Sequence, residues 1–286
     1  MEGLFHNHPF LHKVVVWNKS HHKYWNFFSV LVKIRTEKYN IVINVQRFAL
    51  TGLLTTFSGA KKRIGFSKNP FSMFFTTSIP HVFTKGMHEV KRNLLLIEAL
   101  TDFFMVKPRL YPSTEDNSKT IGYKSGIYYT ISPASLWFTK QYPVEKWVEF
   151  IHYLPVETKI YLLGSGNDSI LCEEIIRLSG NHDCINLSGQ LSFLESASLM
   201  KDARMNFTND SAPMHIASAM NAPVTVIYCS TVPRFGFGPL SDDSGIVEIG
   251  NDLYCRPCGI HGYNSCPEKH FHCATQIDVN QLITRI

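Results

Sequence analysis

The sequence lacks the features that mark several special classes of protein. No stretch of about eighteen uncharged apolar residues occurs, so no segment is predicted to span a bilayer. Charged residues make up 18% and aromatic residues 13% of the chain, which excludes intrinsic disorder because disordered chains are rich in charge and poor in aromatics. Self-similarity with a period of roughly 20 to 50 residues is also absent, which excludes a repeat solenoid.

A large excess of charge of either sign is missing as well. The 28 Lys and Arg residues exceed the 23 Asp and Glu residues by a net charge of +5. This excess is too small to predict a nucleic-acid partner. It suits an anionic ligand or a passing contact with anionic lipid.

The N-terminus shows no basic segment followed by an apolar one, so we expect no signal peptide and a cytoplasmic protein. Thiols are kept reduced in that compartment. The seven cysteines are an odd number in a chain of 286 residues, which argues against a secreted framework of disulfides.

The length and the 44% hydrophobic content predict two domains. The first covers residues 1–106, where apolar, basic and aromatic residues are frequent. Its β-branched runs at 12–17 and 39–45 predict short buried strands, and the periodicity of 88–104 predicts its clearest helix. The segment 66–83, which is rich in aromatics and contains two prolines, is predicted to be irregular.

A polar, proline-bearing segment, 107–120, is predicted to be the linker to a second domain at 121–286. In that domain short apolar runs alternate with helices of about ten residues, which is typical of right-handed crossovers and a doubly wound parallel sheet. Such sheets bind ligands beyond the carboxyl ends of their strands. The predicted fold class is therefore α/β.

One strand-to-helix junction carries the strongest signal of a binding site. A strand passes through a polar turn into a predicted helix at 212–220, and Asp210 and Ser211 are suited to cap that helix. Free N–H groups at Ser211 and Ala212, together with the helix dipole, predict an anion site, and His215 would point into it. The alternative is a capped turn without a ligand, in which His215 merely satisfies its own hydrogen bonds.

The same junction carries a resemblance to a known family. Residues 209–219 closely resemble the C-terminal motif of glycosyltransferase family 9, the ADP-heptose:lipopolysaccharide heptosyltransferases. Further segments are similar to motifs of that family in the same order and cover most of the chain. They lie at 39–65, 88–97, 133–143, 162–168, 186–194, 222–227 and 230–233.

The resemblance implies a GT-B architecture, in which two Rossmann-like domains face each other and the C-terminal one holds most of the donor nucleotide sugar. It also implies that Lys140 pairs with the donor phosphate and that Asp168 holds the ribose hydroxyls. The remaining donor-binding residues that it implies are Asp210, Ser211, Ala212, His215 and Thr231.

A helix N-terminus and Lys140 would supply the positive potential that a nucleotide diphosphate leaving group needs, so we expect no required metal or other cofactor. The alternative for Lys140 is a solvated surface lysine.

The loop 255–273 gathers four of the seven cysteines, Cys255, Cys258, Cys266 and Cys273, with histidines between them. The spacing C-x2-C-x7-C-x6-C predicts a tetrahedral structural zinc site. The second gap is shorter than in common zinc ribbons, so the alternative is a set of reduced or oxidisable thiols.

Family members usually begin with a strand, a loop whose Asp is the proposed base, and a helix. No such segment is found here, so we expect an incomplete N-terminal domain and name no catalytic residue. The predicted function is an inverting, metal-independent glycosyltransferase that moves a heptose-like sugar from an ADP-heptose-like donor to a lipopolysaccharide-type acceptor. The alternative is a non-catalytic, nucleotide-sugar-binding remnant of such an enzyme.

Two segments of the first domain suggest a peripheral contact with the inner membrane and its glycolipid acceptor. These are the basic run 61–63 and the aromatic stretch 69–75. The alternative is a solvated basic loop over buried aromatics.

Overall fold

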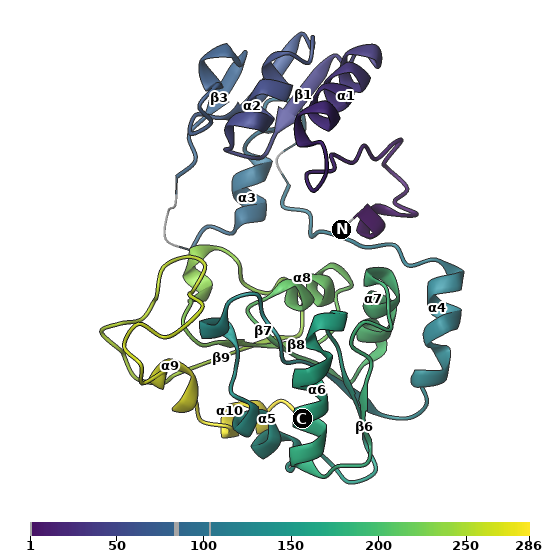
Figure 1. Ribbon diagram of the computed structural model, residues 1–286, viewed down its shortest axis with the longest axis vertical. Helices are drawn as coiled ribbons and strands as arrows, with labels where there is room; N and C mark the ends of the chain where they lie inside the picture. The colour runs from purple at the N-terminus through teal and green to yellow at the C-terminus, as the bar shows by residue number, and fades with distance from the viewer. Residues whose placement is uncertain (1, 83–85, 103) are drawn as a thin grey trace. The chain divides into compact units, whose positions relative to one another are not determined.

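The computed structural model describes residues 2–82, 86–102 and 104–286. The chain divides into two units (Figure 1). The N-terminal unit comprises Leu11–Val106 and Arg234–Gly236. The C-terminal unit comprises Lys107–Pro233 and Phe237–Ile286, together with the residues that precede Leu11.

A six-stranded parallel sheet forms the centre of the C-terminal unit, in the order β6-β5-β4-β7-β8-β9. The order changes direction between β4 and β7, which pair from Tyr129 with Met205 to Ser132 with Thr208. This doubly wound order, with its switch point between β4 and β7, is the Rossmann arrangement. The strands are β4 (Tyr128–Ser132), β5 (Lys159–Leu162), β6 (Cys184–Asn186), β7 (Met205–Asn209), β8 (Val224–Tyr228) and β9 (Ser244–Glu248).

Helices cover both faces of this sheet, because alternate residues of each strand point to opposite sides. On one face, Ile131 and Phe207 lie in an apolar cluster with α5 (Val144–Ile151) and α6 (Ser169–Ser179). The short C-terminal helices α9 (His272–Thr275) and α10 (Asn280–Ile283) join that cluster. On the other face, Tyr128 and Val226 pack with α7 (Phe193–Asp202) and α8 (Ala212–Ala219).

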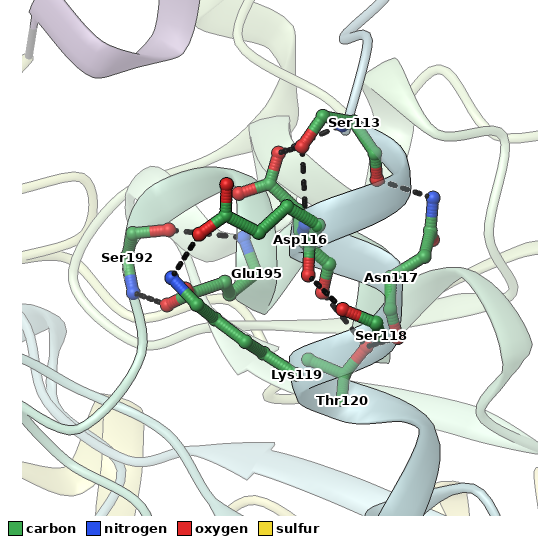
Figure 2. Close-up of polar contacts among 9 residues, drawn as sticks. Ser113, Asp116, Asn117, Ser118, Lys119, Thr120, Ser192 and Glu195 are labelled. Carbon is green, nitrogen blue, oxygen red and sulfur yellow. Dashed lines mark hydrogen bonds and ion pairs between the residues drawn. The ribbon is translucent and has the colours of Figure 1, made fainter.

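The segment predicted to be a linker contains α4 (Thr114–Thr120), which packs on α7. A capping box starts this helix. The hydroxyl of Ser113 accepts from the backbone N–H of Asp116 at 3.0 Å, and the Asp116 carboxylate accepts from the N–H of Ser113 at 2.7 Å (Figure 2). Residues 107–120 therefore belong to the C-terminal unit, and their polar composition reflects a capped surface helix.

The N-terminal unit contains a three-stranded parallel sheet in the order β1-β2-β3. Its small core gathers Ile64, Phe66 and Leu96. The elements are α1 (Lys23–Thr36), β1 (Ile41–Asn44), α2 (Ala49–Thr56), β2 (Lys62–Phe66), β3 (Thr77–Ile79) and α3 (Glu89–Leu94).

Three predicted elements of this unit differ from the structure. Residues 12–17 form no strand, and Val14 and Val16 are exposed, because no neighbouring strand among the described residues pairs with them. The segment predicted to be irregular contains β3, which is held by pairing with β2 rather than by its own composition.

The third difference is the predicted helix at 88–104, of which only α3 forms. After α3 the chain tightens, and the N–H of Leu96 donates to the Asn93 carbonyl at 3.1 Å. Leu96 is thereby buried in the small core, so packing overrides the helical periodicity. Phe103, near the end of the predicted helix, lies outside the described residues.

Across the described part of the chain, no helix combines the length and the apolar character needed to cross a membrane.

Candidate functional site

A pocket of ≈ 740 Å³ opens beyond the carboxyl ends of β4, β5 and β7, at the switch point of the large sheet. The position agrees with the expectation for a doubly wound sheet. Its walls are the loops that follow these strands and the first turns of α7 and α8. Five of the seven residues predicted to bind the donor line it, namely Lys140, Asp168, Asp210, Ser211 and Ala212.

A buried ion pair lies at one end of this pocket. The ammonium of Lys140 is 2.6 Å from Oδ2 of Asp210, and the hydroxyl of Thr231 donates to the same oxygen at 2.6 Å. Asp210 is 7% exposed and Thr231 is 1% exposed, so water screens the contact weakly. An ammonium has three donors, and Asp210 takes one of them. Lys140 is therefore a held cation with donor capacity for a further anion, and not a solvated surface lysine.

Asn209 ties down the loop that carries Lys140. Its side-chain N–H donates to the Pro133 carbonyl at 2.6 Å, and its side-chain oxygen accepts from the Tyr142 N–H at 3.0 Å. Asn209 is fully buried at the end of β7 and holds both ends of the loop between β4 and α5. This contact fixes the loop next to Asp210.

The N-terminus of α8 faces the same pocket. Its N-cap residue, Ser211, makes no side-chain capping bond, and Pro213 lies in the first turn. The N–H groups of that turn and the positive end of the helix dipole thus contribute a second positive feature beside Lys140.

Asp168 lines the pocket but already has a structural task. Its Oδ2 accepts from the N–H and from the hydroxyl of Ser165, both at 2.7 Å. It closes the 3₁₀ turn Gly166–Asp168 after β5 as a capping box. Asp168 therefore shapes the wall of the pocket as well as presenting a carboxylate to it.

Two of the predicted donor residues, His215 and Thr231, are not among the residues that line the pocket. His215 is exposed. Ala212 and Ile216, four positions apart on α8, share the face that lines the pocket. Thr231 reaches the lining through Asp210.

The sequence did not point to the apolar wall of the pocket. Leu136 and Trp137 line it from the loop after β4, and Leu191 and Phe193 line it from the start of α7. Leu136 is 86% exposed. These four side chains fall in the segments 133–143 and 186–194, which resemble motifs of the family, but the resemblance gave a role there only to Lys140.

The cysteine loop does not form the predicted metal site. Within the part of the chain that the structure describes, which includes all four cysteines, no three His, Cys, Asp or Glu side chains are placed to share a metal ion. Cys273 is buried in the first turn of α9, and the thiol of Cys258 donates to the Cys255 carbonyl at 3.2 Å. All four are free thiols.

The N-terminal unit has a buried polar cluster of its own. The carboxylate of Glu89 pairs with Arg92 at 2.6 Å and with the ring of His81 at 3.4 Å. Burial lowers the pKa of His81, and its side chain is wholly inaccessible. The cluster thus holds the start of α3.

Comparison with known proteins agrees with this geometry. The family model of glycosyltransferase family 9 (heptosyltransferase) matches residues 27–267. Lipooligosaccharide heptosyltransferase 2 of Haemophilus ducreyi is 32% identical over 139 residues, which cover 47% of this chain and 38% of that protein. Lipopolysaccharide heptosyltransferase 3 of Escherichia coli is 25% identical over 224 residues, which cover 74% of this chain and 66% of that protein.

Two solved structures share the fold. The E. coli ADP-heptose lps heptosyltransferase II superposes with a TM-score of 0.73 at 18% identity, covering 92% of this chain and 80% of that one. The E. coli heptosyltransferase WaaC solved with ADP gives a TM-score of 0.62 at 19% identity, covering 79% and 72%. The protein is thus an α/β protein of GT-B type. It belongs to glycosyltransferase family 9. The match to the H. ducreyi relative spans 38% of that protein's length.

Proposed function

We propose that the pocket binds an ADP-heptose-like nucleotide diphosphate-sugar and that the protein transfers the sugar to a lipopolysaccharide-type acceptor. The observation that carries this proposal is the Lys140–Asp210–Thr231 contact beside the N-terminus of α8, at the switch point of the sheet. Membership of family 9 and the ADP in a solved relative support the choice of donor.

The proposed reaction is an inverting transfer that needs no metal. An acceptor hydroxyl attacks the anomeric carbon, the bond from that carbon to the diphosphate oxygen breaks, and the acceptor proton passes to a base. Negative charge develops on the leaving diphosphate. Lys140 and the N–H groups of Ser211 and Ala212 stabilise that charge without reorganising, which is the most effective form of electrostatic catalysis. Asp210 and Thr231 keep the ammonium of Lys140 in place.

The rest of the pocket fits a nucleoside. The apolar side chains of Trp137, Leu191 and Phe193 suit a flat base, and the carboxylate of Asp168 suits ribose hydroxyls. This assignment places the diphosphate at the Lys140 end and the nucleoside toward α7.

Calorimetric titration with ADP tests the donor site. Lys140→Ala and Asp210→Asn are each expected to weaken ADP binding by about 1.5–3 kcal/mol, the range for hydrogen bonds to charged groups, or roughly 10- to 150-fold in Kd. Lys146→Ala is the matched control, because Lys146 lies on α5 outside the pocket and pairs with Glu149. Binding in the presence of a chelator should equal binding without it if no metal is needed.

Unaltered ADP affinity in both site variants, with unchanged melting temperatures, would refute the assignment of Lys140 and Asp210 to the donor site. Loss of affinity in Lys146→Ala to the same extent would show a general charge effect instead.

One observation favours the binding-only alternative. In the N-terminal unit Glu89 is held by Arg92 and His81, and Glu37 pairs with Lys13 at 2.5 Å. Both carboxylates are engaged by cations, which makes them poorer bases for an acceptor hydroxyl. A transferase assay with ADP-heptose separates the two functions, since a chain that binds ADP tightly and releases no ADP with any acceptor is a binding protein.

We also propose a peripheral contact of the N-terminal unit with the inner membrane. Residues 11–106 contain fourteen Lys and Arg but four Asp and Glu, whereas the rest of the chain is net negative. On α1 the side chains of Trp25, Phe28 and Val32 are 78%, 58% and 62% exposed along one stripe, near basic Lys23 and Lys33. An exposed apolar stripe in a basic unit supports docking on anionic lipid.

A further inference from the structure

A row of hydrogen bonds around Thr139, called the first row here, lies one residue away from the Lys140–Asp210–Thr231 contact, called the second row. The hydroxyl of Thr139 accepts from the Ser230 hydroxyl at 3.0 Å and from the backbone N–H of Tyr263 at 2.8 Å. The N–H of Thr139 donates to the Tyr263 carbonyl at 3.1 Å, and the N–H of Ser230 donates to the Thr139 carbonyl at 3.2 Å. Thr139 is 1% exposed and Ser230 is fully buried, so this row is shielded from water.

The two rows join the same two backbone segments. Thr139 precedes Lys140 in the chain, and Ser230 precedes Thr231. The first row therefore sets the separation of the two segments, and the second row uses that separation to bring the Lys140 ammonium and the Thr231 hydroxyl to one oxygen of Asp210. A change in the first row moves the backbone of Lys140 and therefore the position of its ammonium.

The loop 255–273 supplies the outer half of the first row and is itself fastened to the end of β8. The guanidinium of Arg256 donates to the carbonyls of Cys229 and Thr231, both at 2.8 Å, and pairs with Glu248 at 2.5 Å. The N–H of Cys258 donates to the Ser230 carbonyl at 2.9 Å.

Gly262 marks how closely the loop approaches Thr139. Its φ of +81° lies in the left-handed region, and a Cβ added there would stand 2.9 Å from the Thr139 hydroxyl. It would also stand 3.3 Å from Cγ of Lys140. The loop thus closes on this row at a point that has no room for a side chain.

We propose that Thr139 is a positioning residue for Lys140 and that the segment 256–263 of the cysteine loop is the brace that holds Thr139. The proposal rests on the proposed function, in which Lys140 binds the donor diphosphate. It assigns the loop a task that requires no metal. The brace acts on phosphate recognition more than on nucleoside recognition, because Leu191 and Phe193 lie on another segment of the pocket wall and Trp137 alone shares the turn of Thr139.

Thr139→Val removes the acceptor of the Ser230 hydroxyl and of the Tyr263 N–H and keeps the side-chain volume. ADP affinity is expected to fall roughly tenfold, adenosine affinity to stay within about twofold, and Thr139→Ser to restore ADP binding. In a Lys140→Ala background Thr139→Val should cause no further loss of ADP affinity. Thr120→Val is the control for stability, since Thr120 is equally buried but bonds Ser198 on α7.

A ligand-free measurement separates this proposal from the donor assignment. Acetylation of Lys140 by a succinimidyl ester, followed by peptide mass spectrometry with Lys146 as internal reference, is expected to be several-fold faster in Thr139→Val. Gly262→Ala pushes the loop away while keeping Thr139, so it should give the same increase in the acetylation rate. It replaces Thr139→Val in the test if that variant does not fold. Faster acetylation with no ADP binding by the wild type would refute the donor assignment and keep the positioning role. Unchanged acetylation in both variants, or equal losses for ADP and adenosine, would overturn the positioning role.

Discussion

At the scale of single residues, two groups among the seven cysteines differ in burial. Burial raises the pKa of Cys172 to about 12 and that of Cys184 to about 11. Cys229 is fully buried and its pKa is raised well above the usual range for the same reason. By contrast Cys255 and Cys266 are partly exposed on the cysteine loop. Because the thiolate is the reactive form, the two groups should differ in reactivity.

Alkylation with iodoacetamide at about pH 8 tests this difference. Cys255 and Cys266 are expected to react first, and Cys172, Cys184 and Cys229 only when the protein unfolds. Peptide mass spectrometry over time, with a denatured sample as control, gives the order. Fast labelling of Cys172 in the folded protein would contradict the burial described here.

Lys140, Asp210, Ser211 and Ala212 line the pocket because they lie in segments that follow β4 and β7, where a doubly wound sheet places its ligands. That they bind the donor stays a prediction. Their supports could not be predicted in the same way. The Thr139–Tyr263 contact joins residues 124 positions apart, and no local pattern encodes such a pair.

At the scale of elements, α4 and α7 are joined through one carboxylate. Oε2 of Glu195 accepts from the Ser192 N–H at 2.6 Å, and Oε1 lies 3.1 Å from the ammonium of Lys119 (Figure 2). The Ser192 N–H, and next Lys119, lower the pKa of Glu195 against the opposing effect of burial. Ser192 lines the pocket, so this contact also supports the start of the pocket-lining helix.

The lowered pKa predicts how stability depends on pH. A carboxyl group whose pKa is lower in the folded state contributes stability that is complete above its unfolded pKa, about 4.3 for Glu, and is lost as the pH falls through the folded pKa. Glu195→Gln should therefore lower the free energy of unfolding by about 1 kcal/mol near neutral pH. The difference from the wild type should shrink between about pH 5 and pH 3.

Urea unfolding at a series of pH values measures this effect. Glu174→Gln, on an exposed position of α6, is the control and should change little at any pH. A Glu195→Gln penalty that stays constant down to about pH 3 would show that volume or polarity matters here, and not the charge.

Element predictions succeeded where local signals and packing agree. The alternation of strands and helices after residue 121 matches β4 to β8, because the central strands β4, β7 and β8 are fully buried in a parallel sheet and show as apolar runs. Element prediction failed at α4, whose polar sequence serves a capping box. It also failed at 12–17, whose β-branched residues have no neighbouring strand in the described residues.

At the scale of the whole molecule, charge is distributed unevenly along the chain. Residues 11–106 have a net charge of +10, and the rest of the chain has −5, which gives the overall +5. Composition alone hid this contrast, since the two parts offset each other. Basic groups near an anionic bilayer contribute about 1 kcal/mol each, and an exposed apolar stripe adds to that by insertion. Membrane affinity is thus expected to reside in the N-terminal unit.

Sedimentation with lipid vesicles tests this expectation. The protein should bind vesicles that contain phosphatidylglycerol, bind pure phosphatidylcholine weakly, and be released near 1 M salt, where the Debye length is about 3 Å.

Lys23→Glu should weaken binding by at least about fivefold, given about 1 kcal/mol for each basic residue. Phe28→Ser should weaken it even at low salt, because its effect comes from buried apolar area. Lys201→Glu, at an exposed position of α7 in the C-terminal unit, is the control for net charge. If Lys201→Glu and Lys23→Glu lose equal affinity, a general charge effect explains the binding and α1 is not the docking face.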